Sequence, residues 1–380
     1  MQATWTPVHL AAGVPANLIS RSSHCLSVVG RRAFIFGGEL KPRTPIGNEV
    51  LVVDLDGKDP SRVVEPASAA QAWPIARVGA SMVAHAASKA LYLWGGRGGK
   101  DMSPIETRRG DGEQDTDDLW RFDTVQEKWT KLETQRGTSS EFPQDRSYHT
   151  AAIAGDRLFI HAGCPASGRL ASLESIELGD LTWSTLPSAP EPGRGGTVLT
   201  AIESPTGAKQ LIRWGGFCGY ELGGPLDIFD IASATWTSSE VSLLNISGQP
   251  PKRSVHGLVP YPLGAKSISH GTFGEAKAIA IMFMGEGQGA PKELGHDGAG
   301  KFLDDVYALL RSLSEPSTFA WLRIEPKVAN SSIAPQPRGW FAFDATNTKN
   351  GLEIIAHGGL NEANERIGDA WRLSIGHAAV

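Results

Sequence analysis

The sequence predicts an all-β protein, a six-bladed β-propeller in which the N-terminal strand joins the last blade and closes the ring. Three observations support this fold: a composition rich in glycine and proline, an apolar run ending in glycine that recurs six times, and a final repeat that lacks one strand. Glycine and proline make up about 18% of the 380 residues, against roughly 12% in an average protein. Such a composition without low complexity is typical of short strands joined by tight turns.

The recurring run marks the second strand of each repeat. Its six copies lie at 33–38, 91–96, 158–163, 211–216, 281–286 and 353–359. An arginine precedes every copy, where an earlier strand should begin: Arg21, Arg77, Arg146, Arg194, Arg253 and Arg338. An alternating run after each copy predicts a third strand, and a tryptophan marks the fourth strand in four repeats: Trp129, Trp183, Trp236 and Trp321. Each repeat therefore matches a kelch blade of four antiparallel strands.

The ring should close through the two ends of the chain. The last repeat has no tryptophan strand, whereas residues 3–8, "ATWTPV", repeat the "ATW" of the fourth blade. Placing this segment on the last blade would remove the exposed sheet edges of an open array. The expected single domain covers 1–380, with blades near 21–73, 74–142, 143–190, 191–249, 250–334 and 335–380 plus 3–8.

The totals argue against several classes of function. Lysine and arginine number 36 against 41 acidic residues, so no basic field indicates nucleic acid as a partner. No apolar run is long enough to span a bilayer, and the first residues lack the charged start and apolar core of a signal peptide. Three scattered cysteines fit a reducing compartment better than a disulfide framework. We expect a cytoplasmic protein without a membrane partner, as a monomer or a homodimer.

The candidate site lies at one mouth of the propeller channel. The loops after the glycine runs and the loops before the arginines should meet on one face, which is the default position for a ligand site. Six residues directly follow the glycine runs: Glu39, Arg97, Cys164, Phe217, Glu286 and Leu360. The segments 97–118 and 286–303 are long enough to cover this mouth.

The mouth contains candidate catalytic and binding residues, and their residue types allow both a structural and a functional interpretation. The six repeated arginines are either architectural or ligands for an anion, and Arg97 stands apart because no other blade has an arginine after its glycines. Its planar fork suits a sulfate, phosphate or carboxylate. Our candidate catalytic residues are Arg97, Glu39 and His149. Our candidate substrate contacts are Arg97, Arg146, Tyr148, Phe217 and Trp340.

Histidines recur in the odd-numbered blades, three residues after the repeated arginine. They are His24, His149 and His256. One reading is that each histidine bonds to backbone within its own blade, and the other is that all three bind a metal on the propeller axis. The spacing alone leaves both readings open.

The segment 283–302 follows a buried strand and carries candidate metal ligands. Glu286, Glu293, His296 and Asp297 offer oxygen and nitrogen donors, which suit iron(II) or manganese better than structural zinc. The plain alternative is a polar surface loop. The acidic run 111–118 lacks the spacing of a calcium loop. Because no phosphate-loop or dinucleotide motif occurs, no nucleotide or organic cofactor is expected.

Longer stretches resemble the plant specifier proteins, kelch proteins of the nitrile-specifier, thiocyanate-forming and epithiospecifier types. The resemblance rests on "RSSHCLSVVGRRAFIFGGELKPRTPIGNEVLVVDL" at 21–55, on "RSYHTAAIAGDRLFIHAG" at 146–163 and on "GHDGAGKFLDDVYAL" at 295–309. It implies iron(II)-dependent conversion of glucosinolate aglycones into nitriles, epithionitriles or thiocyanates. It also implies that Arg97 faces the substrate's sulfate and that Glu39 lies at the same mouth.

The family's metal motif, E-x-x-x-D-x-x-x-H, is altered in this chain. Glu286 and His296 match its ends in kind, but the spacing between them is longer and no aspartate lies between them. Glu293 is the nearest carboxylate substitute, and Asp297 follows the histidine. The expected function is a specifier-like lyase or isomerase of specialised metabolism with a small-molecule substrate. The alternatives are a kelch cyclase or isomerase without metal and a non-catalytic module that binds a protein partner.

Overall fold

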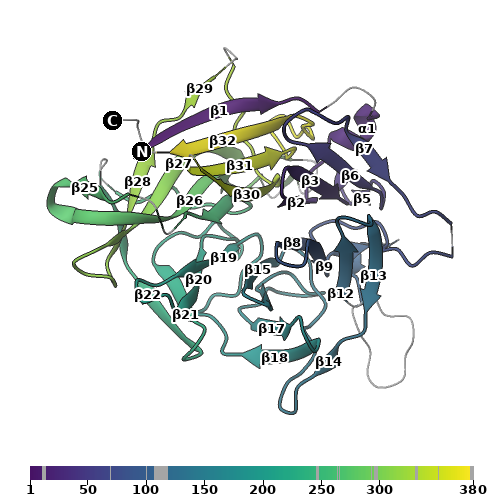
Figure 1. Ribbon diagram of the computed structural model, residues 1–380, viewed down its shortest axis with the longest axis horizontal. Helices are drawn as coiled ribbons and strands as arrows, with labels where there is room; N and C mark the ends of the chain where they lie inside the picture. Colours follow the sequence, from purple (N-terminus) through teal and green to yellow (C-terminus); the bar gives the residue numbers. More distant parts are fainter. Residues whose placement is uncertain are drawn as a thin grey trace.

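Six β-sheets stand around a central axis in the computed structural model of the chain (Figure 1). The structure describes residues 1–10, 14–68, 70–99, 101–106, 119–244, 248–262, 264, 266–291, 293–294, 298–329, 333–349 and 351–376. In this part of the chain, strands dominate beside one short helix, α1 (Ala16–Ile19), and one 3-10 turn, η1 (Gly271–Phe273). The predicted all-β propeller with six blades is confirmed.

Each blade contains four antiparallel strands, which follow one another outward from the axis in chain order except that β1 is the outermost strand of the sixth blade. The first three blades are formed by β2 (Cys25–Val29), β3 (Arg32–Phe36), β6 (Val50–Asp54) and β7 (Arg62–Val64); by β8 (Ser81–His85), β9 (Ala90–Trp94), β12 (Leu119–Asp123) and β13 (Lys128–Leu132); and by β15 (Thr150–Ala154), β16 (Arg157–His161), β17 (Leu173–Glu177) and β18 (Thr182–Leu186).

The remaining blades follow the same order. They are formed by β19 (Val198–Glu203), β20 (Lys209–Trp214), β21 (Leu226–Asp230) and β22 (Thr235–Ser239); by β24 (Gly257–Pro260), β26 (Gly274–Gln288), β27 (Lys301–Ser312) and β28 (Phe319–Ile324); and by β30 (Ala342–Thr348), β31 (Gly351–His357), β32 (Ala370–Gly376) and β1 (Gln2–Val8). In the fifth blade, β25 (Ile268–His270) also pairs with β26.

Three blade-to-blade connections cover the outer edge of the blade that they enter. Short strands in them pair in parallel with the outermost strand: β14 (Gln135–Arg136) with β18, β23 (Val241–Leu243) with β28, and β29 (Lys327–Val328) with β1. A covered edge offers no unpaired N–H and C=O groups to another chain.

The N-terminal strand closes the ring, as the sequence predicts. β1 pairs antiparallel with β32 from Gln2 opposite Gly376 to Val8 opposite Ala370, and Figure 1 shows the two strands side by side. The side chain of Trp5 on β1 is 3% exposed. It lies against Phe283 of the fifth blade, with ring centroids 6.4 Å apart.

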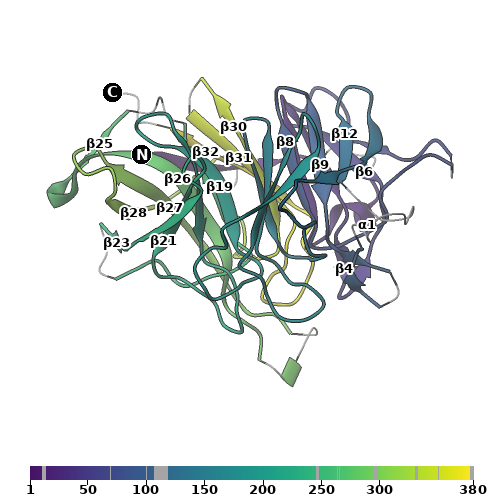
Figure 2. The ribbon, with the colours of Figure 1, turned by 90° about the horizontal axis from the view of Figure 1, so that it is seen from below.

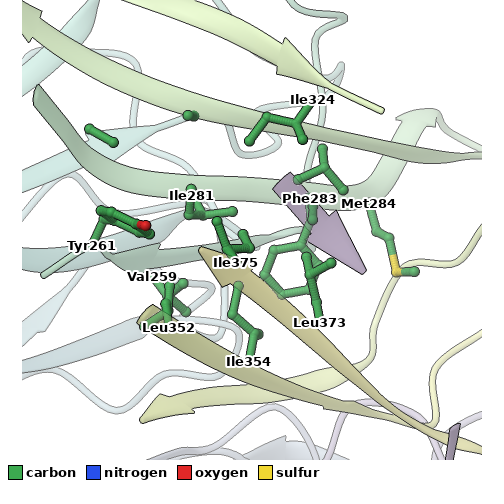
Figure 3. Packing of buried hydrophobic residues seen from close by; sticks show 14 of the residues in the cluster. Val259, Tyr261, Ile281, Phe283, Met284, Ile324, Leu352, Ile354, Leu373 and Ile375 are labelled. Carbon is green, nitrogen blue, oxygen red and sulfur yellow. The ribbon is translucent and has the colours of Figure 1, made fainter. Parts of the chain in front are cut away.

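Apolar side chains between neighbouring blades form the core. In the contact between the fifth and sixth blades, Ile281 and Phe283 on β26 face Ile354 on β31 and Leu373 on β32 (Figure 3). All four side chains have no more than 1% of their surface exposed. The alternating apolar residues of each strand therefore hold blade to blade as well as strand to strand.

A closed ring of backbone hydrogen bonds surrounds the axis, and we call it the axial ring. Its members follow the six repeated arginines by two positions: Ser23, Gly79, Tyr148, Gly196, Val255 and Trp340. Each N–H donates to the carbonyl of the preceding member, over 2.7–3.3 Å, and Ser23 closes the circle by donating to Trp340. Every member has a left-handed backbone, with φ between 45° and 62°.

The glycine runs form a second set of contacts between blades. The N–H of the last glycine in each run donates to the carbonyl of the next blade's arginine, for example Gly38 to Arg77 at 2.8 Å and Gly359 to Arg21 at 2.9 Å. A side chain on Gly38 would bring its Cβ within 2.7 Å of the Ser22 carbonyl oxygen. This close approach explains the recurring glycine.

The six repeated arginines are buried inside their own blades. Each guanidinium donates to the carbonyl of the residue before the last glycine, as Arg146 does to Ala162 at 3.2 Å. Arg146 also forms an ion pair with Glu174 at 3.0 Å, and its exposed fraction is 0%. These contacts support the architectural reading of the arginine repeat.

The recurring histidines are buried as well. His24 Nε2 lies 2.9 Å from Nδ1 of His357 in the sixth blade, while His256 packs edge-on against Trp214 and its ring nitrogens have no hydrogen-bond partner among the described residues. For these two histidines, the interpretation that each bonds to backbone within its own blade is therefore wrong. Within the described ranges, no group of three histidine, cysteine, aspartate or glutamate side chains could hold a metal. The axial metal bound by three histidines therefore has no support there. Neither of the helical turns found in these ranges is long and apolar enough to cross a bilayer.

Replacing Trp5 with alanine should lower the free energy of unfolding by about 3–5 kcal/mol. The indole is buried in the contact between the fifth and sixth blades, so its loss leaves a cavity where the ring closes. Urea unfolding of the purified protein measures this change. Trp236→Ala, which removes a partly exposed indole, should cost less, and equal losses would contradict the predicted contribution of the closing strand.

Substituting Arg146 by methionine should destabilise the protein by about 3–5 kcal/mol, because a buried Glu174 would lose its partner. Thermal unfolding of Arg146→Met, compared with Arg136→Gln in an exposed ion pair, measures the difference. We expect a change below about 1 kcal/mol for the exposed pair. An Arg146 variant as stable as the wild type would contradict the architectural assignment.

The His256→Phe variant should be less sensitive to acid than the wild type. Burial, followed by the charge of Arg253, holds the pKa of His256 well below 6.5, whereas the unfolded chain binds the proton near pH 6.5. The folded state therefore loses stability as the pH falls below about 6.5, by up to about 1.4 kcal/mol per pH unit for this residue. Unfolding curves from pH 7 to pH 5 should show a smaller loss in the variant, and identical slopes would refute the assignment.

Candidate functional site

A cavity of about 510 Å³ opens at the mouth of the channel. All six residues that follow the glycine runs line it: Glu39, Arg97, Cys164, Phe217, Glu286 and Leu360. Each is fixed by an antiparallel bridge to the residue after its blade's arginine, as Glu39 is to Ser22 and Glu286 is to Ser254. Seen from the side, β4 (Glu39–Lys41) projects from the body at this mouth (Figure 2).

Aromatic side chains of the axial ring form the floor of this cavity. Tyr148 of the third blade and Trp340 of the sixth blade meet edge to face, with ring centroids 5.2 Å apart. The Tyr148 side chain also forms a hydrogen bond with Ser23, and burial together with the charge of Glu39 raises the pKa of Tyr148 to about 12. The floor therefore carries a neutral phenol and an indole at neutral pH.

Two arginines without a carboxylate partner among the described residues face the cavity. Arg97 begins β10 (Arg97–Gly98), which pairs with β11 (Ser103–Pro104). Its Nε donates to Ser147 Oγ at 2.7 Å, and its guanidinium lies 5.5 Å from the Tyr148 ring centroid. Arg169 lies over the Phe217 ring at 4.7 Å. Both cations are held by contacts that leave their charge available to an anion.

Cys164 lies near both cations at the mouth. Burial raises the pKa of its thiol, and the charges of Arg169 and Arg97 offset this increase only in part. The group is therefore a neutral thiol at neutral pH and lines the cavity as a small polarisable side chain.

Glu39 lies at the mouth in a paired state. Its Oε1 accepts a hydrogen bond from the guanidinium of Arg366 at 3.1 Å, and its Oε2 accepts one from the backbone N–H of Arg43 at 2.8 Å. Arg366 belongs to the loop before β32. The Glu39 carboxylate thus joins the loops of the first and sixth blades and carries little uncompensated charge.

In the part of the chain that the structure describes, no ion pair joins Glu286 to an arginine or a lysine. Its Oε2 accepts a hydrogen bond from Trp340 Nε1 at 3.2 Å, and the backbone N–H of Gly300 also donates to this carboxylate. Burial, followed by the negative charge of Glu221, raises the pKa of Glu286 to about 7. Two carboxylates therefore approach each other on one side of the cavity, opposite in sign to Arg97 and Arg169.

Several candidate residues lie elsewhere. Arg146 is enclosed in its blade, and His149 lines a separate cavity of about 680 Å³ at the other end of the channel. His149 packs edge-on against Trp94, with ring centroids 5.0 Å apart. Glu293 is exposed and does not line the mouth cavity. His296, Asp297 and residues 107–118 of the first long segment lie outside the described residues.

The mouth residues that were not anticipated from the sequence include Arg169, Glu221 and Arg366. Two of them pair with the residue after a glycine run, because Glu221 bridges to Phe217 and Arg366 bridges to Leu360. The chain folds back on itself directly after these glycine runs. The sequence therefore contained a signal for these residues, namely the short polar segment that follows each glycine run. Glu221 and Arg366 stand where the chain returns and pairs with the residue directly after the run.

Comparisons with known proteins agree with this architecture. The family model of the KLHDC2/KLHL20/DRC7 Kelch-repeats domain matches residues 23–264. The chain is 26% identical to the N-(sulfonatooxy)prop-2-enimidothioate sulfolyase of Thlaspi arvense over 404 residues, which covers 99% of this chain and 98% of the relative. It is also 26% identical to the acyl-CoA-binding domain-containing protein 6 of Oryza sativa subsp. japonica over 136 residues, 34% of this chain and 19% of the relative.

The family match covers more than half of the chain, and the full-length likeness to the sulfolyase extends over all six blades. The chain belongs to the family of Kelch-repeats domains.

Proposed function

We propose that the protein is a specifier-like lyase that acts on a small anionic sulfur compound, a glucosinolate aglycone or an analogue, at the mouth cavity. The observation that carries this proposal is that Arg97, which has no carboxylate partner among the described residues, shares the cavity with the buried Glu286, in a chain that resembles a sulfolyase over its whole length. The name of that relative describes a thioimidate that carries a sulfonatooxy group on its nitrogen. A substrate of this class has an anionic end and a sulfur end.

The anionic end would bind to Arg97. Because Ser147 accepts the hydrogen bond from Nε, the plane of the guanidinium is fixed while its two terminal nitrogens remain able to donate. A planar fork that donates two hydrogen bonds suits the oxygens of a sulfate group. When the bond between nitrogen and the sulfate oxygen breaks, charge accumulates on the leaving sulfate. Arg97 would stabilise that charge.

The sulfur end and the side chain of the substrate would lie against the aromatic residues. Tyr148 and Trp340 form the floor, and Phe217 stands on the wall beneath Arg169. Contact with these rings excludes water from a reactive intermediate, which would otherwise rearrange or hydrolyse in solution. We include Tyr148, Phe217 and Trp340 as substrate contacts and Arg97 as the residue that touches the reacting group.

The family resemblance implies iron(II), and the donors at the mouth fit a divalent ion. Glu286 is buried and lines the same cavity as Glu221, whose Oε1 has no hydrogen-bond partner among the described residues. Glu286 would hold the ion, and His296 and Asp297 of the same loop are further candidate ligands, whereas Glu293 does not line the cavity. Bound iron(II) supplies a Lewis acid for the soft sulfur of the substrate.

A second candidate function is a non-catalytic module that binds a protein partner. The observation that favours it is the family match itself, because a propeller fold does not determine its activity. The same mouth residues would then contact a peptide instead of a small molecule. A third candidate, a cyclase or isomerase without metal, differs from the first in its independence from iron.

The Arg97→Gln variant should lose about 10²–10³-fold in kcat/KM toward N-(sulfonatooxy)prop-2-enimidothioate, because a charge-assisted donor to the leaving sulfate is removed. Product analysis by gas chromatography measures nitrile, thiocyanate and epithionitrile. Arg121→Gln, a partly exposed arginine of the second blade beside Asp123, is the matched control and should retain full activity.

Three results separate the candidate functions. Wild-type turnover that depends on added iron(II) and is lost in Arg97→Gln supports the lyase. Turnover that persists in the presence of a chelator favours the metal-free enzyme. A wild-type protein that changes neither the products nor their rate, with or without iron(II), removes the enzymatic proposal.

A further inference from the structure

Glu221 is a buried carboxylate for which the family resemblance provides no role. It lies between β20 and β21, on the returning arm of the mouth segment of the fourth blade, and bridges to Phe217. The backbone N–H of Leu222 bonds to the Gly216 carbonyl at 2.8 Å and fixes this arm. The preceding Tyr220 is 61% exposed, whereas Glu221 is 9% exposed. The alternation of the arm therefore directs Glu221 into the cavity.

The Glu221 carboxylate is only half satisfied. Its Oε2 accepts the backbone N–H of Gly289 at 3.3 Å. Its Oε1 has no hydrogen-bond partner in the described part of the chain. Burying an ionised oxygen without a partner is costly, and proteins compensate for such an oxygen with a cation or a proton. An oxygen in this state at the edge of a ligand cavity indicates a missing partner.

Glu221 and Glu286 face the same volume from different blades. Gly289, which holds Glu221, lies three residues after Glu286 on the segment that leaves β26. Glu286 is fixed from the other side by the indole of Trp340. Neither carboxylate forms an ion pair with an arginine or lysine among the residues described. Both are therefore oriented by neutral N–H donors, which set their position without cancelling their charge.

Two like charges in a buried site repel each other unless something positive lies between them. Glu221 and Glu286 line the same mouth cavity, and the backbone N–H that holds Glu221 belongs to Gly289, three residues after Glu286. Oxygen donors that are held rigidly, with free lone pairs and open cavity beside them, are suited to Mn²⁺ or Fe²⁺. The cations already at the mouth, Arg97 and Arg169, interact with Tyr148 and Phe217 instead.

We propose that Glu221 and Glu286 together bind a divalent metal ion, so that the fourth blade supplies the second carboxylate that the altered loop of the fifth blade lacks. The site thereby joins two neighbouring blades instead of lying within one loop. This inference deepens the proposed function and rests on its metal site, but it does not depend on the identity of the substrate.

The test is metal binding by variants of the full chain, with Fe²⁺ under anaerobic conditions and Mn²⁺ in air as the probes. Isothermal titration calorimetry gives the dissociation constant, and the shift of the melting temperature on adding metal gives a second readout. Glu221→Gln keeps the shape of the side chain and the acceptor for Gly289. Glu240→Gln, an exposed glutamate after the fourth blade, is the matched control.

We expect Glu221→Gln and Glu286→Gln each to weaken metal binding at least about tenfold and to lose the metal-induced rise in melting temperature. Glu240→Gln should bind metal like the wild type. The melting temperature without metal should not fall in Glu221→Gln, which would show that the variant is folded.

Two results would overturn the inference and remain distinct from failure of the proposed function. If Glu221→Gln binds metal as tightly as the wild type while Glu286→Gln does not, the metal lies at Glu286 without Glu221. If the wild type binds neither ion, the carboxylate pair is not a metal site. Turnover of the substrate without metal would then still support the lyase, in its metal-free form.

Discussion

The axial ring is the constraint on which the rest of the molecule depends. Its members sit in a left-handed conformation that costs a residue other than glycine about 1–2 kcal/mol, and four of the six are Ser23, Tyr148, Val255 and Trp340. The closed circle of hydrogen bonds and the buried arginines two residues earlier offset this strain. Because the ring members all turn the chain at the same level along the propeller axis, the residues after the glycine runs all lie at one mouth of the channel.

The fold was predictable because its repeat is dictated by backbone geometry. The glycine runs remain recognisable where Ala162 and Met284 occupy a left-handed position, since a single side chain there is tolerated. The closing strand was predictable from one tryptophan motif. The pairing of β14, β23 and β29 with the outer strands was not, because two or three residues carry no period that a sequence pattern can detect.

The candidate site was predictable only in part, for a reason that the axial ring explains. Arg146, Tyr148 and His149 are close in sequence, but the left-handed turn at Tyr148 separates their side chains among the blade interior, the cavity floor and the opposite end of the channel. A residue that is close in sequence to a mouth residue therefore does not have to line the mouth cavity. Glu221 and Arg366 reach the mouth through short returning arms, whose register depends on contacts between blades.

The pairing of β1 with β32 has a consequence for how the chain acquires its structure. During synthesis β1 is made long before its partner, because it can pair only when residues 370–376 have been made, so this contact joins segments more than 360 residues apart. Such non-local pairings slow folding and come late. Until then, no blade covers the indole of Trp5. The propeller of the nascent protein stays open, and β1 remains unpaired.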